Sequence, residues 1–133
     1  MEKTTVLVAS TNPIMRRLLR DLVASAENLH LVAAVEDASS LLLRAKKSSP
    51  DVALLDLTEG ISLSHVRQFR LVSLASVVCI SAQTQPGAPE SSAAYQAGAA
   101  RVLGMPSGSV SLDLLPAAGE IILDALRNVA ERK

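Results

Sequence analysis

Two kinds of apolar pattern alternate along the chain. Short runs of aliphatic and β-branched residues are typical of strands buried on both faces, whereas apolar positions that recur every three or four residues indicate amphipathic helices. The runs predict strands at Thr4–Ala9, Leu29–Val35, Asp51–Asp56, Ser76–Ser81 and Ala100–Gly104. The periodic stretches predict helices from Pro13, over Ala38–Lys47, from about Ser62 to Arg70, through Tyr95 to Gly98, and from about Leu115 to the end.

Local signals mark where several of these elements begin and end. Asn12 is placed to cap the first helix, and Pro13 takes its first position, where a missing N–H is harmless. Gly98 follows the alanine-rich helix as a C′ glycine. Gln83–Glu90, with two prolines and a glycine, is predicted to be a loop. These boundaries agree with the alternation of strand and helix.

Five strands alternating with five helices predict an α/β fold. Because crossovers between parallel strands are right-handed, such a chain forms one five-stranded parallel sheet with helices on both faces, a three-layer α/β/α sandwich. The length suits one domain, so residues 1–133 are predicted to form a single one. Ligands and chemistry collect beyond the carboxyl ends of the strands in such sheets. The residues at those ends are Ser10, Thr11, Asp56, Ser81 and Gly104–Pro106.

Composition and charge narrow the function classes. Hydrophobic residues make up 49% of the chain and charged residues 20%, with a mean hydropathy of +0.31, which excludes a disordered chain. Thirteen basic residues balance thirteen acidic ones, which argues against a nucleic-acid binder. No stretch suits a signal sequence or a bilayer span, so we expect a cytoplasmic protein without a membrane partner. The single cysteine, Cys79, excludes a disulfide scaffold and favours a reducing compartment.

Several residue types with potential chemistry are assigned simpler roles. His30 and His65 lie far apart without ligand spacing, and Cys79 lies inside a predicted strand as a buried thiol. The arginines of the first helix are expected to form a solvated face that could dock an acidic partner. Motifs for phosphate loops, zinc peptidases and serine hydrolases do not occur in the sequence.

Four segments near the predicted strand ends resemble, in order and spacing, a response-regulator receiver domain of the CheY-like superfamily. They are Val6–Pro13, Pro50–Asp56, Ile80–Ala82 and Met105–Pro106. Two longer stretches, Asn12–Asp21 and Met105–Leu114, are similar to the receiver half of chemotaxis protein-glutamate methylesterases, where the second normally reads Lys-Pro-Ser-Gly-Ser. The resemblance covers essentially the whole chain. It implies a flavodoxin-like (β/α)5 fold and a place in two-component or chemotaxis signal transduction.

The resemblance also assigns site residues and shows where this chain departs from the family. Asp56 takes the phosphoacceptor position and Ser81 the switch-hydroxyl position. The departures are Ser10 and Thr11 at the two metal-binding carboxylate positions, Met105 at the lysine position and Val102 at the aromatic switch position. One acceptor and one hydroxyl are therefore kept, while the charged partners are lost.

These departures remove the charges on which phosphoryl transfer to a carboxylate depends. Mg²⁺ prefers near-octahedral oxygen ligands with one or two carboxylates among them, whereas the hydroxyls of Ser10 and Thr11 are neutral. Unit charges ~4 Å apart contribute ~4 kcal/mol at an effective dielectric of ~20, so losing the lysine alone weakens phosphate stabilisation roughly a hundredfold or more. We expect weak or no Mg²⁺ binding, no other cofactor and no useful phosphorylation of Asp56.

The sequence thus predicts a degenerate receiver that acts as a phosphorylation-independent interaction and regulatory module, with no catalytic residue. In receivers the output face is made by the fourth and fifth helices and the fifth strand, here roughly Glu90–Ala97, Ala100–Gly104 and Leu115–Ala130. A methylesterase domain or another signalling protein is the expected partner, and a homodimer stays open. Two alternatives remain: a conventional receiver phosphorylated on Asp56, and the N-terminal regulatory domain of a methylesterase that continues beyond Lys133.

Overall fold

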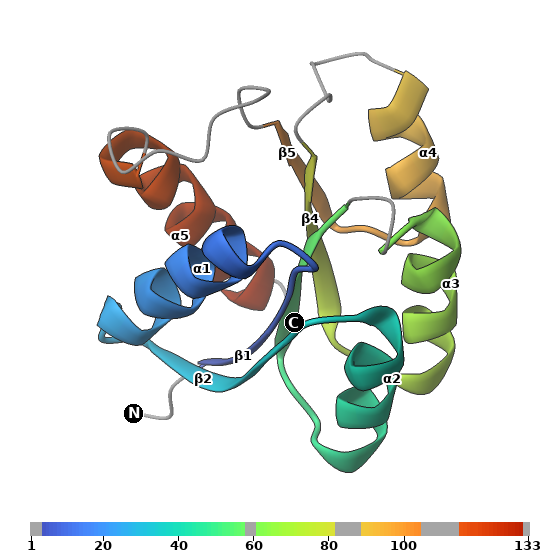
Figure 1. The fold of residues 1–133 in the computed structure, drawn as a ribbon. Helices are drawn as coiled ribbons and strands as arrows, with labels where there is room; N and C mark the ends of the chain where they lie inside the picture. The colour runs from blue at the N-terminus through green and yellow to red at the C-terminus, as the bar shows by residue number, and fades with distance from the viewer. Residues whose placement is uncertain (1–3, 58–60, 82–88, 105–114, 132–133) are drawn as a thin grey trace.

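Five strands form one sheet between two layers of helices (Figure 1). The computed structural model describes residues 4–57, 61–81, 89–104 and 115–131. The strands are β1 (Thr4–Ala9), β2 (Leu29–Val35), β3 (Val52–Asp56), β4 (Ser76–Ser81) and β5 (Arg101–Gly104). The helices are α1 (Pro13–Ser25), α2 (Ala38–Lys47), α3 (Leu63–Val72), α4 (Pro89–Ala97) and α5 (Leu115–Glu131).

The strand order is β2-β1-β3-β4-β5, and every pair is parallel. Figure 1 shows α1 and α5 on one face of the sheet and α2, α3 and α4 on the other. The predicted three-layer sandwich is therefore confirmed. The chain leaves β1 toward β2 and returns to β3 on the other side of β1. This reversal is the switch point at which α/β sheets place their ligands, and it brings the carboxyl ends of β1 and β3 together.

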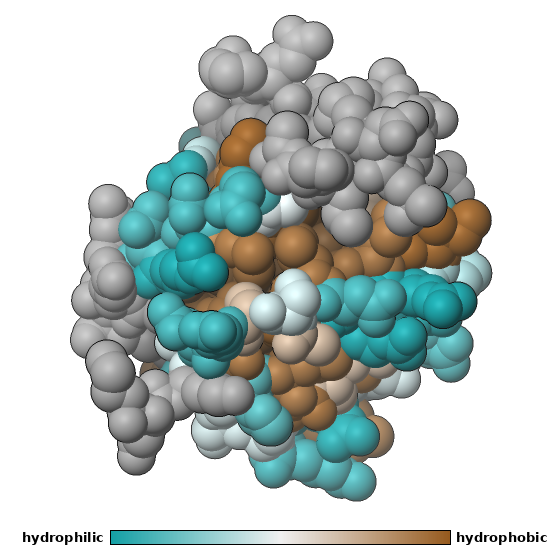
Figure 2. Space-filling model, turned by 90° about the vertical axis from the view of Figure 1, so that its left-hand side faces the viewer, coloured by the Kyte–Doolittle hydropathy of each residue, from teal (hydrophilic) through white to brown (hydrophobic). Residues whose placement is uncertain are grey.

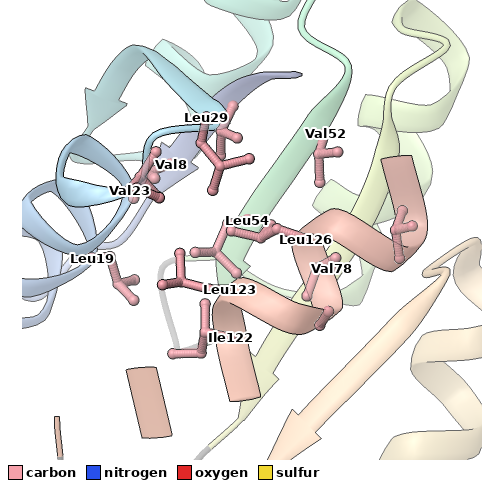
Figure 3. Packing of buried hydrophobic residues seen from close by; sticks show 14 of the residues in the cluster. Val8, Leu19, Val23, Leu29, Val52, Leu54, Val78, Ile122, Leu123 and Leu126 are labelled. Atoms are coloured by element: carbon pink, nitrogen blue, oxygen red, sulfur yellow. The ribbon is translucent and has the colours of Figure 1, made fainter. Parts of the chain in front are cut away.

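Each face of the sheet carries its own apolar core. Alternate residues of β1 and β3 point to opposite faces, so Val8 and Leu54 pack beneath α1 and α5 while Leu7 and Leu55 pack beneath α2, α3 and α4. Figure 3 shows the first of these cores, in which Leu19, Val23, Ile122, Leu123 and Leu126 of the helices meet the strands. The buried stretches Val6–Ala9 of β1 and Val52–Leu55 of β3 are thus apolar, and the buried polar residues Ser10 and Asp56 follow directly after them.

The residues that cap the helix ends include those that the sequence predicted. Asn12 Oδ1 accepts hydrogen bonds from the backbone N–H groups of Ile14 and Met15 at 2.9 and 3.1 Å, which confirms the predicted N-cap. Gly98 has a φ of 121°, a left-handed conformation that favours glycine and ends α4 as predicted. His65 has a structural role as well, because its Nδ1 accepts a hydrogen bond from the backbone N–H of Ser62 at the start of α3.

Some boundaries differ from the prediction. The predicted loop Gln83–Glu90 overlaps α4, which begins at Pro89, because proline is tolerated in the first helical turn and so does not exclude a helix start. Residues 83–88 of that loop lie outside the described residues. Helix α3 continues past Arg70 to Val72, since nothing in that stretch breaks a helix. In the described part of the chain, no helix is both long and apolar enough to cross a membrane.

Candidate functional site

The ladder between β1 and β3 sets two polar residues side by side at the carboxyl end of the sheet. Ala9 of β1 pairs with Leu55 of β3, and the same register continues one residue further to Ser10 and Asp56. Ser10 Oγ donates a hydrogen bond to Asp56 Oδ2 at 2.8 Å. Ser10 is 0% exposed and Asp56 is 7% exposed. The two form a closed hydroxyl–carboxylate pair.

Ser10 is held in place from three directions. Its backbone N–H donates to the carbonyl of Val35 in β2, and its Oγ accepts from the backbone N–H of Asn12 at 3.2 Å. Its carbonyl accepts from Arg16 Nη1 at 3.1 Å. The Oγ proton has a second acceptor in the Asn12 carbonyl at 3.3 Å, but the Asp56 carboxylate is closer and charged. The network therefore directs the hydroxyl proton of Ser10 toward Asp56.

The charge on Asp56 is only partly compensated. Burial raises the pKa of Asp56 above its ordinary value, and the hydrogen bond from Ser10 opposes that shift as the smaller effect. The ion pairs between described residues all lie on α1 and α5, and none includes Asp56. The carboxylate is thus buried beside a neutral donor.

Receivers are expected to hold Mg²⁺ here, so the donor set of this site bears on that expectation. Among the residues that the structure describes, no group of three or more His, Cys, Asp or Glu side chains is placed to hold a metal ion. At the carboxyl ends of β1 and β3 the described donors include one carboxylate, from Asp56, and the hydroxyl of Ser10. This set supplies one carboxylate, the fewest that Mg²⁺ sites usually contain, and no second charged ligand from Ser10.

The remaining predicted site residues are placed unevenly. Thr11 is partly buried and follows Ser10 directly. Ser81 ends β4, one residue beyond the partner of Asp56 in the β3–β4 ladder, so its backbone lies at the same edge of the sheet. Val102 lies on β5 and is partly buried against the core beneath α2, α3 and α4. Met105 lies outside the described residues.

Tyr95 has a contact that the sequence reasoning missed. Its hydroxyl oxygen accepts a hydrogen bond from the backbone N–H of Val102 at 3.3 Å, which ties α4 to the edge strand β5. An edge strand leaves such N–H groups without a ladder partner, so the contact also covers part of the sheet edge. The sequence held one hint of this contact. Tyr95 is the sole tyrosine of the chain, and it lies seven residues before Val102, the position where receivers carry an aromatic residue.

Comparisons with known proteins agree with the fold. No family model matches the chain. The chain is 28% identical over 135 residues to the protein-glutamate methylesterase/protein-glutamine glutaminase of Methanococcus maripaludis, covering 100% of this chain and 37% of that protein. It spans about a third of the length of the curated relatives that it matches.

Solved structures with the same fold include two from chemotaxis proteins. The response regulator domain of Thermotoga maritima CheB superposes with a TM-score of 0.88 at 24% identity, covering 98% of both chains. A complex of the P1 domain of CheA3 with CheY6 from R. sphaeroides matches with a TM-score of 0.69 at 22% identity, covering 94% of this chain and 99% of that one. In sequence and fold, the chain is similar to response-regulator receiver domains and to the N-terminal part of protein-glutamate methylesterases.

Proposed function

We propose that this receiver is a regulatory module whose output does not depend on Mg²⁺-assisted phosphorylation of Asp56. The observation that carries the proposal is the 2.8 Å hydrogen bond from Ser10 Oγ to Asp56 Oδ2. In the receivers that the sequence resembles, an acidic residue takes the place of Ser10 and holds the metal ion together with the phosphoacceptor. Here a neutral hydroxyl binds one oxygen of the acceptor instead.

Electrostatics support this proposal. A phosphoryl group on Asp56 would add negative charge to a side chain that is 7% exposed and whose pKa burial already raises. Phosphoryl transfer relies on neutralising the charge of the equatorial oxygens, for which receivers use the metal and a lysine. Ser10 and Thr11 carry no charge, and the lysine position is Met105. The transfer reaction therefore lacks the groups that stabilise its transition state.

The module would work through protein contacts in chemotaxis-type signalling, as one receiver domain over residues 1–133. We place its output on α4, β5 and α5, where the Tyr95–Val102 hydrogen bond joins α4 to β5 and leaves Tyr95 47% exposed. The partner would be a methylesterase domain or another signalling protein, with a second copy as the alternative occupant. We expect neither nucleic acid nor a membrane as a partner.

Labelling with a small acyl phosphate tests the proposal. The chain is incubated with the donor and Mg²⁺, and intact mass spectrometry measures phosphorylation. We expect Asp56 to stay unmodified, and we expect a variant combining Ser10→Asp, Thr11→Asp and Met105→Lys to gain Mg²⁺ binding and a phosphoryl group. Circular dichroism verifies that the variant folds. Stoichiometric labelling of the unaltered chain that Asp56→Asn abolishes would overturn the proposal.

A second candidate is the N-terminal regulatory domain of a methylesterase. It is favoured by the share of the relatives that the chain spans, 37% of the Methanococcus maripaludis enzyme and 35% of two others. In that case the receiver would restrain a catalytic domain in the same polypeptide. Sequencing the gene beyond the codon for Lys133 tests this: an open frame encoding a methylesterase domain supports it, and a stop codon contradicts it.

A further inference from the structure

Helices α2 and α3 and the turn after α3 carry exposed aliphatic side chains. Leu43 of α2 is 52% exposed, Leu71 and Val72 of α3 are 85% and 37% exposed, and Leu74 in the turn after α3 is 92% exposed. Helix α3 buries Val66 and Phe69 toward the sheet, so Leu71 lies on its opposite side. Helices α2 and α3 contact each other, and several exposed large aliphatic side chains on neighbouring elements are typical of an interaction surface.

The turn that presents Leu74 has a defined geometry. The hydroxyl of Ser73 accepts a hydrogen bond from the backbone N–H of Ala75 at 3.1 Å, and Arg70 Nη1 donates to the carbonyl of Ala75 at 3.0 Å. The stem of Arg70 lies against Gly98, where an added Cβ would come within 2.8 Å of Arg70 Cγ. Hydrogen bonds from Arg70 and to Ser73 therefore fix the conformation of the turn, and this conformation leaves Leu74 exposed.

The same surface is uniformly basic. Five cations lie on these two helices: Arg44, Lys46, Lys47, Arg67 and Arg70. Neither 38–50 nor 61–81 contains an aspartate or a glutamate. No ion pair between described residues involves any of the five cations. We call the exposed aliphatic residues Leu43, Leu71, Val72 and Leu74, together with the five cations, the α2–α3 face.

The opposite side of the molecule differs in charge. Figure 2 looks onto the side where α1 and α5 lie, and apolar surface crosses its centre between polar clusters. Exposed Ile14 and Ile121 belong to α1 and α5. There, however, the cations have acidic neighbours: Arg17 and Arg20 lie 4.0 and 3.5 Å from Asp21. The five cations of the α2–α3 face thus have no ion pair with a described residue, whereas Arg17 and Arg20 of α1 do.

We infer that the α2–α3 face docks an acidic segment of a partner protein that also carries aliphatic side chains. The partner's carboxylates would pair with the lysines and arginines, and its aliphatic groups would cover the leucines. Membrane binders of this kind anchor with aromatic residues, but Phe69 is buried and Tyr95 lies on α4. The same lack of aromatic platforms disfavours a nucleic acid. This surface is separate from the proposed output face and independent of Asp56.

A synthetic amphipathic peptide, with glutamates on one helical face and leucines on the other, tests the inference. Backbone amide shifts of the full chain are followed by NMR during titration. We expect the shift changes to cluster at 43–47 and 67–74, and we expect a peptide with glutamine for every glutamate to bind at least roughly tenfold more weakly, since charge pairing contributes both affinity and specificity. No binding, or shift changes centred elsewhere, would overturn the inference.

Matched variants separate this surface from general electrostatics. Lys46→Glu with Lys47→Glu is expected to weaken binding by roughly tenfold or more, and Leu71→Ser with Leu74→Ser to a similar extent. The control, Arg17→Glu with Arg20→Glu on α1, makes the same change in net charge and should leave the affinity unchanged. Equal weakening by both charge variants would contradict the inference. Tighter binding of the unaltered chain to anionic phospholipid vesicles than to the peptide would assign the surface to a membrane instead.

Discussion

Two aspartates stand at opposite ends of the β3 segment, and each is bonded to a hydroxyl-bearing residue of the β1 segment. Before the strand, Asp51 Oδ2 accepts from both the backbone N–H and the hydroxyl of Thr5, at 2.9 and 3.1 Å. At its carboxyl end, Asp56 Oδ2 accepts from Ser10 Oγ at 2.8 Å. Both pairs are separated by 46 residues, because both extend the register of one ladder.

The two pairs differ in how well the carboxylate is compensated. Asp51 is partly exposed and has a reciprocal partner, since its own N–H donates to the Thr5 hydroxyl at 2.9 Å. Asp56 is buried, and burial raises its pKa. The same ladder therefore has a stabilising set of hydrogen bonds between Thr5 and Asp51 at one end, which we call the Thr5–Asp51 clamp, and an unfavourable buried charge on Asp56 at the other. The unfavourable end is the one that lies at the switch point, where α/β sheets carry their function.

Removing the Thr5–Asp51 clamp should lower the free energy of unfolding more than any other change considered below. In Asp51→Ala the Thr5 N–H and hydroxyl lose their acceptor, and we expect the free energy of unfolding to fall by about 2 kcal/mol, as for other part-buried donors left unpaired. Urea denaturation followed by circular dichroism measures it. The control is Asp124→Ala, which removes only an exposed ion pair with Arg127 and should cost less than ~0.5 kcal/mol. Equal losses in the two variants would show that Asp51 is no clamp.

Removing the donor at the other end should cost somewhat less. Ser10→Ala leaves the Asp56 carboxylate without its hydroxyl donor, so we expect a loss of about 1–2 kcal/mol at neutral pH. The pKa of Asp56 should rise further, because the hydrogen bond that opposes the effect of burial is gone. NMR titration of the Asp56 carboxyl carbon measures that shift. Thr5→Val is the matched variant, and it should cost less because the backbone N–H of Thr5 still reaches Asp51.

The sequence predicted the architecture well, and the reasons are local. Runs such as Val6–Ala9 are buried on both faces, so they predict central strands without knowledge of their neighbours. The predicted loop Gln83–Glu90 extends too far, because the prediction treats Pro89 as a loop residue although proline is also common in the first turn of a helix. Ser10 and Asp56 were each identified as site positions, but their direct bond depends on the register between two strands, which packing sets. The exposure of Leu74 likewise follows from a turn closed by Arg70 and Ser73.

Replacing Asp56 by a neutral residue should change the free energy of unfolding little at low pH and should increase it at neutral pH. Asp56→Asn keeps an oxygen that accepts from Ser10 and removes the buried charge, so we expect a gain within ~1 kcal/mol at pH 7. Because the folded-state pKa of Asp56 is raised, the unfolded chain releases this proton first as the pH rises. The unaltered chain should therefore lose stability relative to Asp56→Asn through the range above pH 3.8 and not regain it. A difference that shrinks with rising pH would contradict the buried-charge assignment.

The carboxyl of Asp37 should affect the pH dependence of stability in the opposite direction to Asp56, and by the smallest amount. It caps α2, where its carboxylate accepts from the backbone N–H of Ser40 at 2.7 Å, and this hydrogen bond lowers its pKa. A carboxyl with a lowered folded-state pKa stabilises the fold above its unfolded-state pKa of about 3.8, and that contribution disappears as the pH falls through the lowered value. The difference in unfolding free energy between the unaltered chain and Asp37→Asn should thus grow with rising pH in favour of the unaltered chain. Denaturation series on Asp37→Asn and Asp56→Asn should therefore diverge in opposite directions from a common acidic starting point, since only the buried carboxylate opposes folding when it ionises.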